Sequence, residues 1–295
     1  MSASSPGWVE ALLAREQLPA SYRTTIEATL RPLAARIAAR ARAISGVLPV
    51  GLCGAQGSGK TTAATALGEL LRECGTPAAV LSLDDFYLTH AARQALARSV
   101  HPLLITRGVP GTHDLPLALE IIAALQRGER PALPRFDKSR DDRLPAARWQ
   151  RPPAAVKVVL LEGWCTDARP EPETALQQPI NDLERNEDAG GIWRRYVNAQ
   201  LAGPYRALFD PLAMLILLQA PSFEVVYRWR LEQEHKLRAR LAAAGQDSRG
   251  VMDDAAVARF IAHYERVTRH ILAEMPRRAN QVIRLDATRA VIGRT

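Results

Sequence analysis

The sequence has few cysteines, few aromatic residues and no long apolar run. Its three cysteines, Cys53, Cys74 and Cys165, are scattered and odd in number, so they fit neither a disulfide framework nor a zinc site. Phe, Trp and Tyr make up 5% of the chain, which is too few for a platform on which nucleic-acid bases stack. Because no run reaches about 18 apolar residues, we expect no membrane span.

The amino terminus and the cysteines together indicate a compartment. Residues 1–7 lack the basic-then-apolar pattern of a secretory signal. Cysteines that stay unpaired are typical of reducing compartments. We therefore expect a cytoplasmic protein whose thiols are free.

The net charge of +8 has two interpretations. A basic surface can bind nucleic acid, whereas a basic site can bind a triphosphate together with a second anionic substrate. The arginines are spread through stretches of helical character such as 36–42 and 228–240, and no RNA- or DNA-binding motif accompanies them. The second interpretation is favoured, and we expect neither a nucleic acid nor a membrane as partner.

One motif carries most of the functional information. Residues Gly54–Thr61 read GAQGSGKT and match the phosphate-binding pattern G-x-x-x-x-G-K-[ST]. An apolar run (48–53) precedes the motif and a helical pattern (61–72) follows it, as a phosphate-binding loop requires. Its glycines let backbone N–H groups wrap round a polyphosphate, Lys60 reaches the outer phosphates, and the Thr61 hydroxyl holds Mg²⁺. The motif predicts a nucleoside triphosphate site rather than a glycine-rich turn without a ligand.

The rest of the chain alternates strand and helix patterns. Apolar runs predict further strands at 78–83, 156–161, 212–218 and 281–285. Apolar periodicity predicts two amphipathic helices within 8–45 and a further helix at 116–126. This alternation is typical of an α/β fold, a mostly parallel sheet flanked by helices.

The domain organisation follows from these elements. Residues 1–45 are expected to form an N-terminal helical extension and residues 46–295 the main domain.

Two stretches interrupt the regular pattern. The five prolines and mixed charges of 131–153 predict an irregular loop that crosses the site. The Pro, Asp, Glu and Asn content of 168–191 predicts a mobile insertion.

Carboxylates follow two of the predicted strands. Asp84 and Asp85 come directly after the strand at 78–83, and Glu162 ends the strand at 156–161. Ligands of open parallel sheets bind beyond the carboxyl ends of the strands, so these groups should meet the phosphate loop. We expect Asp84 to accept a proton from a substrate hydroxyl, Asp85 to support it or a metal-bound water, and Glu162 to lie near Mg²⁺. The alternative is that the Asp pair caps the next helical segment.

Three further segments offer polar groups to the site. The tight loop Gly108–Asp114 ends in Thr112, His113 and Asp114, of which His113 is equally compatible with a structural role and Asp114 with a helix cap. Residues 135–139 read RFDKS and offer cations, or else form a solvated charge cluster. Residues 227–231 (YRWRL) open a helix that suits a lid at about 222–245, unless it is an ordinary amphipathic helix.

These segments together resemble a known family. The phosphate loop, SLDDFY (82–87), GVPGTHD (108–114), PRFDKS (134–139), LEGW (161–164) and YRWRLE (227–232) occur here in one order. In this order they look like the D-glycerate 3-kinases of the plant and fungal type and their bacterial relatives. That family lies within the larger group of P-loop kinases that includes phosphoribulokinase, uridine kinase and bacterial pantothenate kinase. The resemblance covers roughly residues 45–290.

The resemblance implies a P-loop NTPase fold with a helical lid, and roles for particular residues. It implies ATP and Mg²⁺ as cofactors, with Asp84 as base, Lys60 and the lid residues Arg228 and Arg230 near the transferred phosphate, and Thr61 and Glu162 at the metal. The implied ATP-binding residues are Gly54, Ala55, Gln56, Gly57, Ser58, Gly59, Lys60, Thr61 and Thr62. The implied contacts to a small acid are Asp85, Tyr87, Thr112, His113, Asp114, Arg135 and Lys138.

The expected activity is transfer of the γ-phosphoryl group of ATP to a hydroxyl of a small acid, D-glycerate above others. One alternative is a kinase of another acceptor in the same larger group, a nucleoside or pantothenate. A second alternative is an ATPase that uses the nucleotide as a switch and is linked to nucleic acid. The carboxylates at the strand ends favour a kinase, because a switch needs no base for a substrate hydroxyl.

Overall fold

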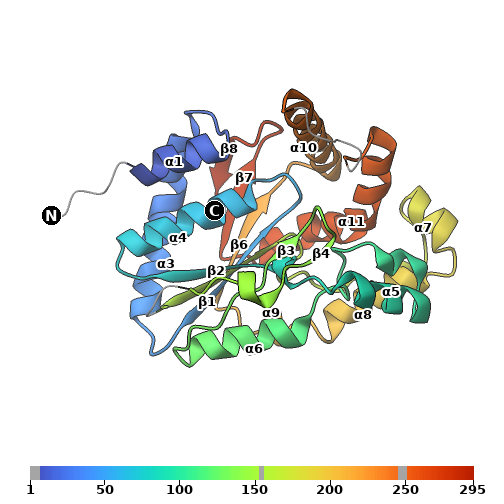
Figure 1. The fold of residues 1–295 in the computed structure, drawn as a ribbon, viewed down its shortest axis with the longest axis horizontal. Helices are drawn as coiled ribbons and strands as arrows, with labels where there is room; N and C mark the ends of the chain where they lie inside the picture. Colours follow the sequence, from blue (N-terminus) through green and yellow to red (C-terminus); the bar gives the residue numbers. More distant parts are fainter. Residues whose placement is uncertain (1–6, 153–155, 245–250) are drawn as a thin grey trace.

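A central sheet of six strands organises the molecule (Figure 1). The computed structural model describes residues 7–152, 156–244 and 251–295. Across the sheet the strands are β2 (Ala78–Ser82), β5 (Val158–Gly163), β1 (Leu48–Gly54), β6 (Met214–Gln219), β7 (Gln281–Leu285) and β8 (Val291–Arg294). All neighbours pair in parallel except β7 and β8, which are antiparallel. The mostly parallel sheet predicted from the sequence is confirmed.

The apolar runs become strands because both faces of the sheet are covered. Every residue of β5 is buried, and β1 and β6 each contain one residue that is not. Helix α4 (Lys60–Glu73), with α1 (Gly7–Arg15) and α3 (Arg31–Arg42) beside it, lies on one side of the sheet (Figure 1). Helices α6 (Leu115–Gln126), α8 (Ile192–Ala202) and α9 (Arg206–Phe209) lie on the other side (Figure 1). This layering explains why the central strands read as continuous apolar runs.

The N-terminal residues form the two helices that the sequence predicts. The first is α1 (Gly7–Arg15), and the second runs through α2 (Tyr22–Thr25), the π-helical turn η1 (Ile26–Leu30) and α3 (Arg31–Arg42). Their buried side chains belong to the same apolar cluster as those of the sheet. Residues 1–6 lie outside the described residues, and the division at residue 45 stays a prediction.

The remaining helical segments connect the strands or cover their ends. They are η2 (Leu83–Phe86), α5 (His90–Ser99), η3 (Pro102–Ile105), η4 (Ala146–Arg148), η5 (Glu173–Leu176), α7 (Asp182–Glu187), α10 (Phe223–Ala243), α11 (Asp254–Glu274) and η6 (Met275–Arg277). Within the described part of the chain, no helix combines the length and the apolar character needed to cross a membrane.

Two predictions about irregular segments are incomplete. The segment predicted as an irregular loop at 131–153 contains a small hairpin, β3 (Phe136–Asp137) paired with β4 (Asp142–Arg143), and its last residue lies outside the described residues. The final strand, β8, was not predicted. It is short, and only every second residue is partly buried, because it lies at the sheet edge beyond β7. A strand of this kind leaves little apolar signal.

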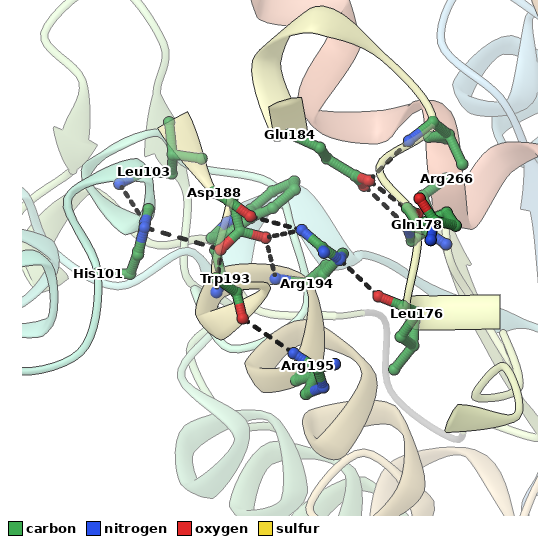
Figure 2. A network of polar contacts seen from close by, with 12 residues as sticks. His101, Leu103, Leu176, Gln178, Glu184, Asp188, Trp193, Arg194, Arg195 and Arg266 are labelled. Carbon is green, nitrogen blue, oxygen red and sulfur yellow. Dashed lines mark hydrogen bonds and ion pairs between the residues drawn. The ribbon is translucent and has the colours of Figure 1, made fainter. Parts of the chain in front are cut away.

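The predicted mobile insertion at 168–191 is wrong, because the segment is packed. It contains η5 and α7, and two of its carboxylates are almost fully buried: Glu184 is 1% exposed and Asp188 is 2% exposed. Both are held by arginines from elsewhere in the chain (Figure 2). Polar composition alone therefore misled the prediction.

The buried carboxylates anchor the segment to two helices. Glu184 forms two hydrogen bonds of 2.7 Å with the guanidinium of Arg266 in α11. Asp188 accepts a hydrogen bond from Arg194 at 3.0 Å and from the backbone N–H groups of Trp193 and Arg194 in the first turn of α8 (Figure 2). Paired in this way, the buried charges do not carry the cost of isolated ones.

Candidate active site

The phosphate loop joins the end of β1 to the start of α4. Gly57 and Gly59 have φ angles of +77° and +83°, a left-handed conformation that glycine adopts without strain. A Cβ atom at Gly57 would lie 2.6 Å from the Cβ of Trp229, so the loop packs directly against α10. Only glycine fits this position, and the loop keeps the geometry of an anion cradle.

Several polar groups of the loop have no hydrogen-bond partner among the described residues. The first turn of α4 has Gly59 as its N-cap and no side chain that caps it, so its backbone N–H groups are free for an anion. The Ser58 hydroxyl and the Gln56 side-chain oxygen are buried and have no hydrogen-bond partner among the described residues. These groups suit a polyphosphate ligand at residues 54–62.

Glu162 lies where the sheet register predicts, next to the phosphate loop. It pairs in register with Leu52 in β1 and Ser82 in β2, and it is 1% exposed. The Thr61 hydroxyl donates a 2.8 Å hydrogen bond to Glu162 Oε1, while Oε2 is buried without a partner among the described residues. A hydroxyl beside a buried carboxylate with a free oxygen fits Mg²⁺, which prefers hard oxygen ligands.

The protein contributes few ligands to such a metal. Among the described residues, no group of three or more His, Cys, Asp or Glu side chains is arranged to hold a metal ion. Mg²⁺ in nucleotide sites is held by one or two protein oxygens together with phosphate oxygens and water. The pair of Thr61 and Glu162 therefore fits a metal that arrives with a nucleotide.

Asp84 lies in the turn η2 that follows β2. Its Oδ1 accepts a 2.7 Å hydrogen bond from the Tyr87 hydroxyl, and its Oδ2 accepts a 2.6 Å bond from Lys138 Nζ. Burial raises the pKa of Asp84, but the charges of Lys138 and Lys60 outweigh burial and hold the pKa below its usual range. Asp84 is thus ionised and within the electrostatic range of the phosphate-loop lysine. It caps no helix, so the capping alternative is wrong for this residue.

The hairpin β3–β4 docks onto η2 through a second ion pair. Arg135 donates a 2.7 Å hydrogen bond to Asp85, and the Phe136 backbone N–H donates one of 3.0 Å to the same carboxylate. Burial raises the pKa of Asp85 more than Arg135 lowers it. Arg135 and Lys138 remain 45% and 60% exposed at the side chain, so both cations also face solvent. The segment 135–139 thus lies beside Asp84 and Asp85, and its contact with a substrate stays a prediction.

The polar residues of the loop 108–114 differ in the groups that they bind. Thr112 donates to the Val109 carbonyl and accepts from the Gly108 N–H, so its hydroxyl serves the loop itself. Asp114 caps α6 through the Leu117 N–H, which confirms the capping alternative, and it also pairs with Arg143.

His113 differs from its neighbours in the loop. It is 5% exposed, and burial lowers its pKa to about 4. Its ring lies 4.9 Å from that of Tyr87, whose hydroxyl binds Asp84. Unlike the side chains of Thr112 and Asp114, that of His113 bonds to no backbone group among the described residues: its Nδ1 contacts the Tyr205 hydroxyl and its Nε2 is buried without a partner there.

The proposed lid is the long helix α10. Arg230 pairs with Glu234 in the next turn, and its guanidinium lies 5.5 Å from the ring centre of Phe260 in α11. Arg228 is exposed on a face of α10 that also carries His235 and Lys236. The two arginines therefore have different surroundings, one within the α10–α11 contact and one at the surface. Residue 245, at the end of the predicted lid, lies outside the described residues.

Comparison with known proteins identifies the family of this chain. Residues 49–166 match the Phosphoribulokinase / Uridine kinase family. An uncharacterized kinase from Schizosaccharomyces pombe is 35% identical over 225 residues, which cover 73% of this chain and 77% of that protein. The chain belongs to the phosphoribulokinase/uridine kinase family. Membership makes it a phosphotransferase that acts on a hydroxyl group, and it implies ATP as donor.

Two further relatives of this kinase carry a more specific name. The chloroplastic D-glycerate 3-kinase of Arabidopsis thaliana is 34% identical over 235 residues, which cover 74% of this chain and 46% of that protein. The chain thus spans about half the length of the plant enzyme. The structure of D-glycerate 3-kinase from Cryptococcus neoformans aligns with a TM-score of 0.74 and 27% identity, covering 94% of this chain and 99% of that one.

Sequence reasoning missed two residues beside the site of this kinase. Arg289, in the turn before β8, donates a 2.7 Å hydrogen bond to the Gly57 carbonyl, pairs with Glu232 at 2.8 Å and lies 5.2 Å from the ring centre of Trp229. Tyr205 contacts His113 from the turn before α9. Neither lies in a motif, and each is more than 90 positions from its partner in the loops, so no local pattern could have found them.

Proposed function

We propose that this kinase transfers the γ-phosphoryl group of ATP to the 3-hydroxyl of D-glycerate. The observation that carries the proposal is a carboxylate, Asp84, that follows β2 at the sheet edge of the phosphate loop, binds Tyr87 and Lys138, and is kept ionised by the charges of Lys138 and Lys60. Cations stand next to it on the hairpin, where an acidic acceptor needs them. The named activities of the Arabidopsis and Cryptococcus relatives support D-glycerate as that acceptor.

Residues 54–62 bind the triphosphate in this proposal. Backbone N–H groups of the loop and the first turn of α4 surround the β-phosphate, and Lys60 reaches the γ-phosphate. Thr61 and Glu162 would hold Mg²⁺, which would neutralise charge on the phosphate oxygens. These groups stabilise the charge that spreads over the transferred phosphoryl group.

Asp84 receives the proton of the attacking hydroxyl. Its carboxylate stays ionised because Lys138 and Lys60 offset its burial, so the acceptor oxygen can bind it as a hydrogen-bond donor. A carboxylate of low pKa is a weak base, which suits a loose transition state in which the proton leaves late. Tyr87 fixes the orientation of the carboxylate through Oδ1.

The carboxylate of the acceptor is bound by the hairpin. Lys138 and Arg135 already contact carboxylates and keep exposed faces, so each can turn to a substrate carboxylate as well. His113 adds a third contact from the loop 108–114. Asp85, Thr112 and Asp114 act on the shape of this pocket, because their side chains are held by protein groups.

The helix α10 closes over the nucleotide in this proposal. Arg228 is exposed on the helix whose Trp229 touches the phosphate loop, so a small rotation brings it towards the phosphates. Arg230 supports the helix through Glu234 and Phe260.

A coupled ADP-release assay with an acceptor panel tests the proposal. D-glycerate, L-glycerate, uridine, pantothenate and ribulose 5-phosphate are each added to Mg·ATP, with the Lys60→Ala protein as blank. Strong release with D-glycerate alone supports the assignment. Release with uridine or pantothenate instead moves the protein to another acceptor class. Release that needs only RNA or DNA favours a nucleotide switch and contradicts the proposal.

A further inference from the structure

A buried tyrosine contacts the ring of His113 from behind the acceptor site. Tyr205 is fully buried at the start of α9. Its hydroxyl accepts a 3.0 Å hydrogen bond from the Gly111 N–H and is within hydrogen-bond distance of His113 Nδ1. The contact joins a turn near residue 205 to the loop 108–114, which are far apart in the sequence.

The hydrogen bonds around Tyr205 determine which nitrogen of His113 carries the proton. The Tyr205 oxygen already accepts from Gly111, and among the described residues His113 Nδ1 is the group placed to receive the hydroxyl proton. Tyr205 therefore donates to Nδ1, which must be unprotonated. In a neutral imidazole the other nitrogen then carries the hydrogen. His113 is held as the Nε2–H tautomer.

The Nε2–H group has no partner in the protein. It is buried and makes no hydrogen bond to any described residue. Buried polar groups without partners are rare in folded proteins and need an explanation. Asp84 is close enough for its charge to act on the ring, and the ring packs beside Tyr87, which binds Asp84. A donor without a partner thus lies within electrostatic range of the proposed base and shares the neighbour Tyr87 with it.

We propose that Tyr205 is a positioning residue which keeps His113 in the Nε2–H tautomer, so that His113 donates a hydrogen bond to an oxygen of the acceptor substrate. This inference rests on the proposed function and adds to it. The opposite tautomer would present a lone pair at Nε2 and repel a carboxylate, which can only accept hydrogen bonds, whereas a hydroxyl could still donate to it. The tautomer thus favours acceptors that carry a carboxylate beside the reacting hydroxyl.

Nuclear magnetic resonance tests the tautomer without any substrate. The chemical shifts of the two ring nitrogens of ¹⁵N-labelled histidine distinguish a protonated nitrogen from an unprotonated one. We expect the Nε2–H form for His113 in the wild-type protein and a mixture of forms in Tyr205→Phe. Because this measurement needs no turnover, it stands even if the acceptor panel fails. A wild-type His113 in the Nδ1–H form would overturn the proposal.

Kinetics tests the consequence with the best acceptor from the panel. Tyr205→Phe should lower kcat/KM for the acceptor about tenfold, the effect of one hydrogen bond, with KM for ATP unchanged. His113→Gln keeps an N–H near the position of Nε2 and should retain most of the activity, whereas His113→Leu should lose it. In the His113→Gln background, Tyr205→Phe should cause no further loss, because glutamine has no tautomer to control.

A matched variant separates positioning from packing. Tyr196 packs its ring against the same glycine, Gly111, from α8, so Tyr196→Phe removes a neighbouring hydroxyl without touching His113. It should leave the kinetics unchanged. Equal losses in Tyr196→Phe and Tyr205→Phe, or equal losses from Tyr205→Phe in both His113 backgrounds, would reduce Tyr205 to a packing role. If Tyr205→Phe fails to fold, equal activity of His113→Gln and His113→Leu still contradicts the proposal.

Discussion

Two residues have separate roles in the proposed transfer: Lys60 stabilises charge on the phosphate, and Asp84 accepts the proton of the hydroxyl. Lys60→Ala should abolish turnover, because the γ-phosphate loses the lysine that the proposed mechanism assigns to it. Asp84→Asn should still bind ATP but should lower kcat by about 10²–10⁴-fold, because an amide cannot accept the hydroxyl proton. Equilibrium dialysis with ATP and steady-state kinetics separate the two effects. Normal turnover by Asp84→Asn would show that Asp84 is not the base.

His113 also makes the free energy of unfolding depend on pH. Its pKa is lowered from 6.5 to about 4 by burial, so between these values the unfolded chain binds a proton that the folded chain does not. Stability should therefore rise as pH increases from about 4 to about 6.5, with a contribution of about 3 kcal/mol. Urea unfolding at several pH values should show a smaller rise for His113→Gln than for the wild-type protein.

His263 provides a comparison for that measurement. Burial lowers its pKa to about 4 as well, so His263→Gln should reduce the pH dependence in the same direction. It lies in α11 near Trp193 and not beside Asp84. A pH dependence that is the same in the wild-type protein and both variants would show that neither histidine is neutral in the folded state.

At this scale the sequence could predict the residues that follow strands. The spacing of Gly54–Thr61 determines a phosphate loop, and the register of parallel strands brings Glu162 beside it. Tyr205 and Arg289 could not be predicted, because their roles depend on contacts across the fold. Thr112 was predicted to contact substrate, yet its hydroxyl serves the loop, a distinction that only the geometry reveals.

Among the elements, the segment 168–191 depends on its buried ion pairs. Arg266→Met leaves Glu184 buried without its cation and should lower stability by about 3–5 kcal/mol. Replacing both residues by apolar ones, Arg266→Met with Glu184→Leu, should restore much of the loss, because no buried charge remains. Urea unfolding of both variants measures the effect. A double variant that is less stable than the single one would contradict this account.

The helix α10 allows a second test, because its two arginines have different environments. Arg228→Met should lower kcat about tenfold and leave unfolding unchanged, since Arg228 is exposed. Arg230→Met should lower stability by about 1–3 kcal/mol, because Glu234 is 5% exposed and loses its partner. Kinetics and urea unfolding are measured on both. A loss of stability in Arg228→Met would argue that α10 is a fixed support and not a lid.

The elements that the sequence predicted well are those with strong apolar periodicity. The central strands and helices α4 and α6 read clearly because each buries an apolar face or core. The segment 168–191 was predicted wrongly because charged residues usually indicate exposure. The arginine that neutralises Glu184 is 82 positions away, so the sequence does not show the pairing. The strand β8 has too few apolar residues to be predicted from the sequence.

For the whole molecule, the order of strands determines where chemistry takes place. Strands β2, β5 and β1 are neighbours, so Asp84, Glu162 and the phosphate loop reach the same edge of the sheet. The helices α10 and α11 and the hairpin β3–β4 lie near that edge (Figure 1). This placement follows from parallel topology and could be predicted, whereas the choice of acceptor depends on side chains that local patterns do not specify.

Identification of the phosphorylated product is the most direct test of the central claim. The protein is incubated with Mg·ATP and D-glycerate labelled with ¹³C at carbon 3, and the product is analysed by ³¹P and ¹³C NMR. Transfer to the 3-hydroxyl predicts coupling between phosphorus and the labelled carbon, and none with the Lys60→Ala protein. Release of inorganic phosphate alone, or phosphate on the 2-hydroxyl, would contradict the account.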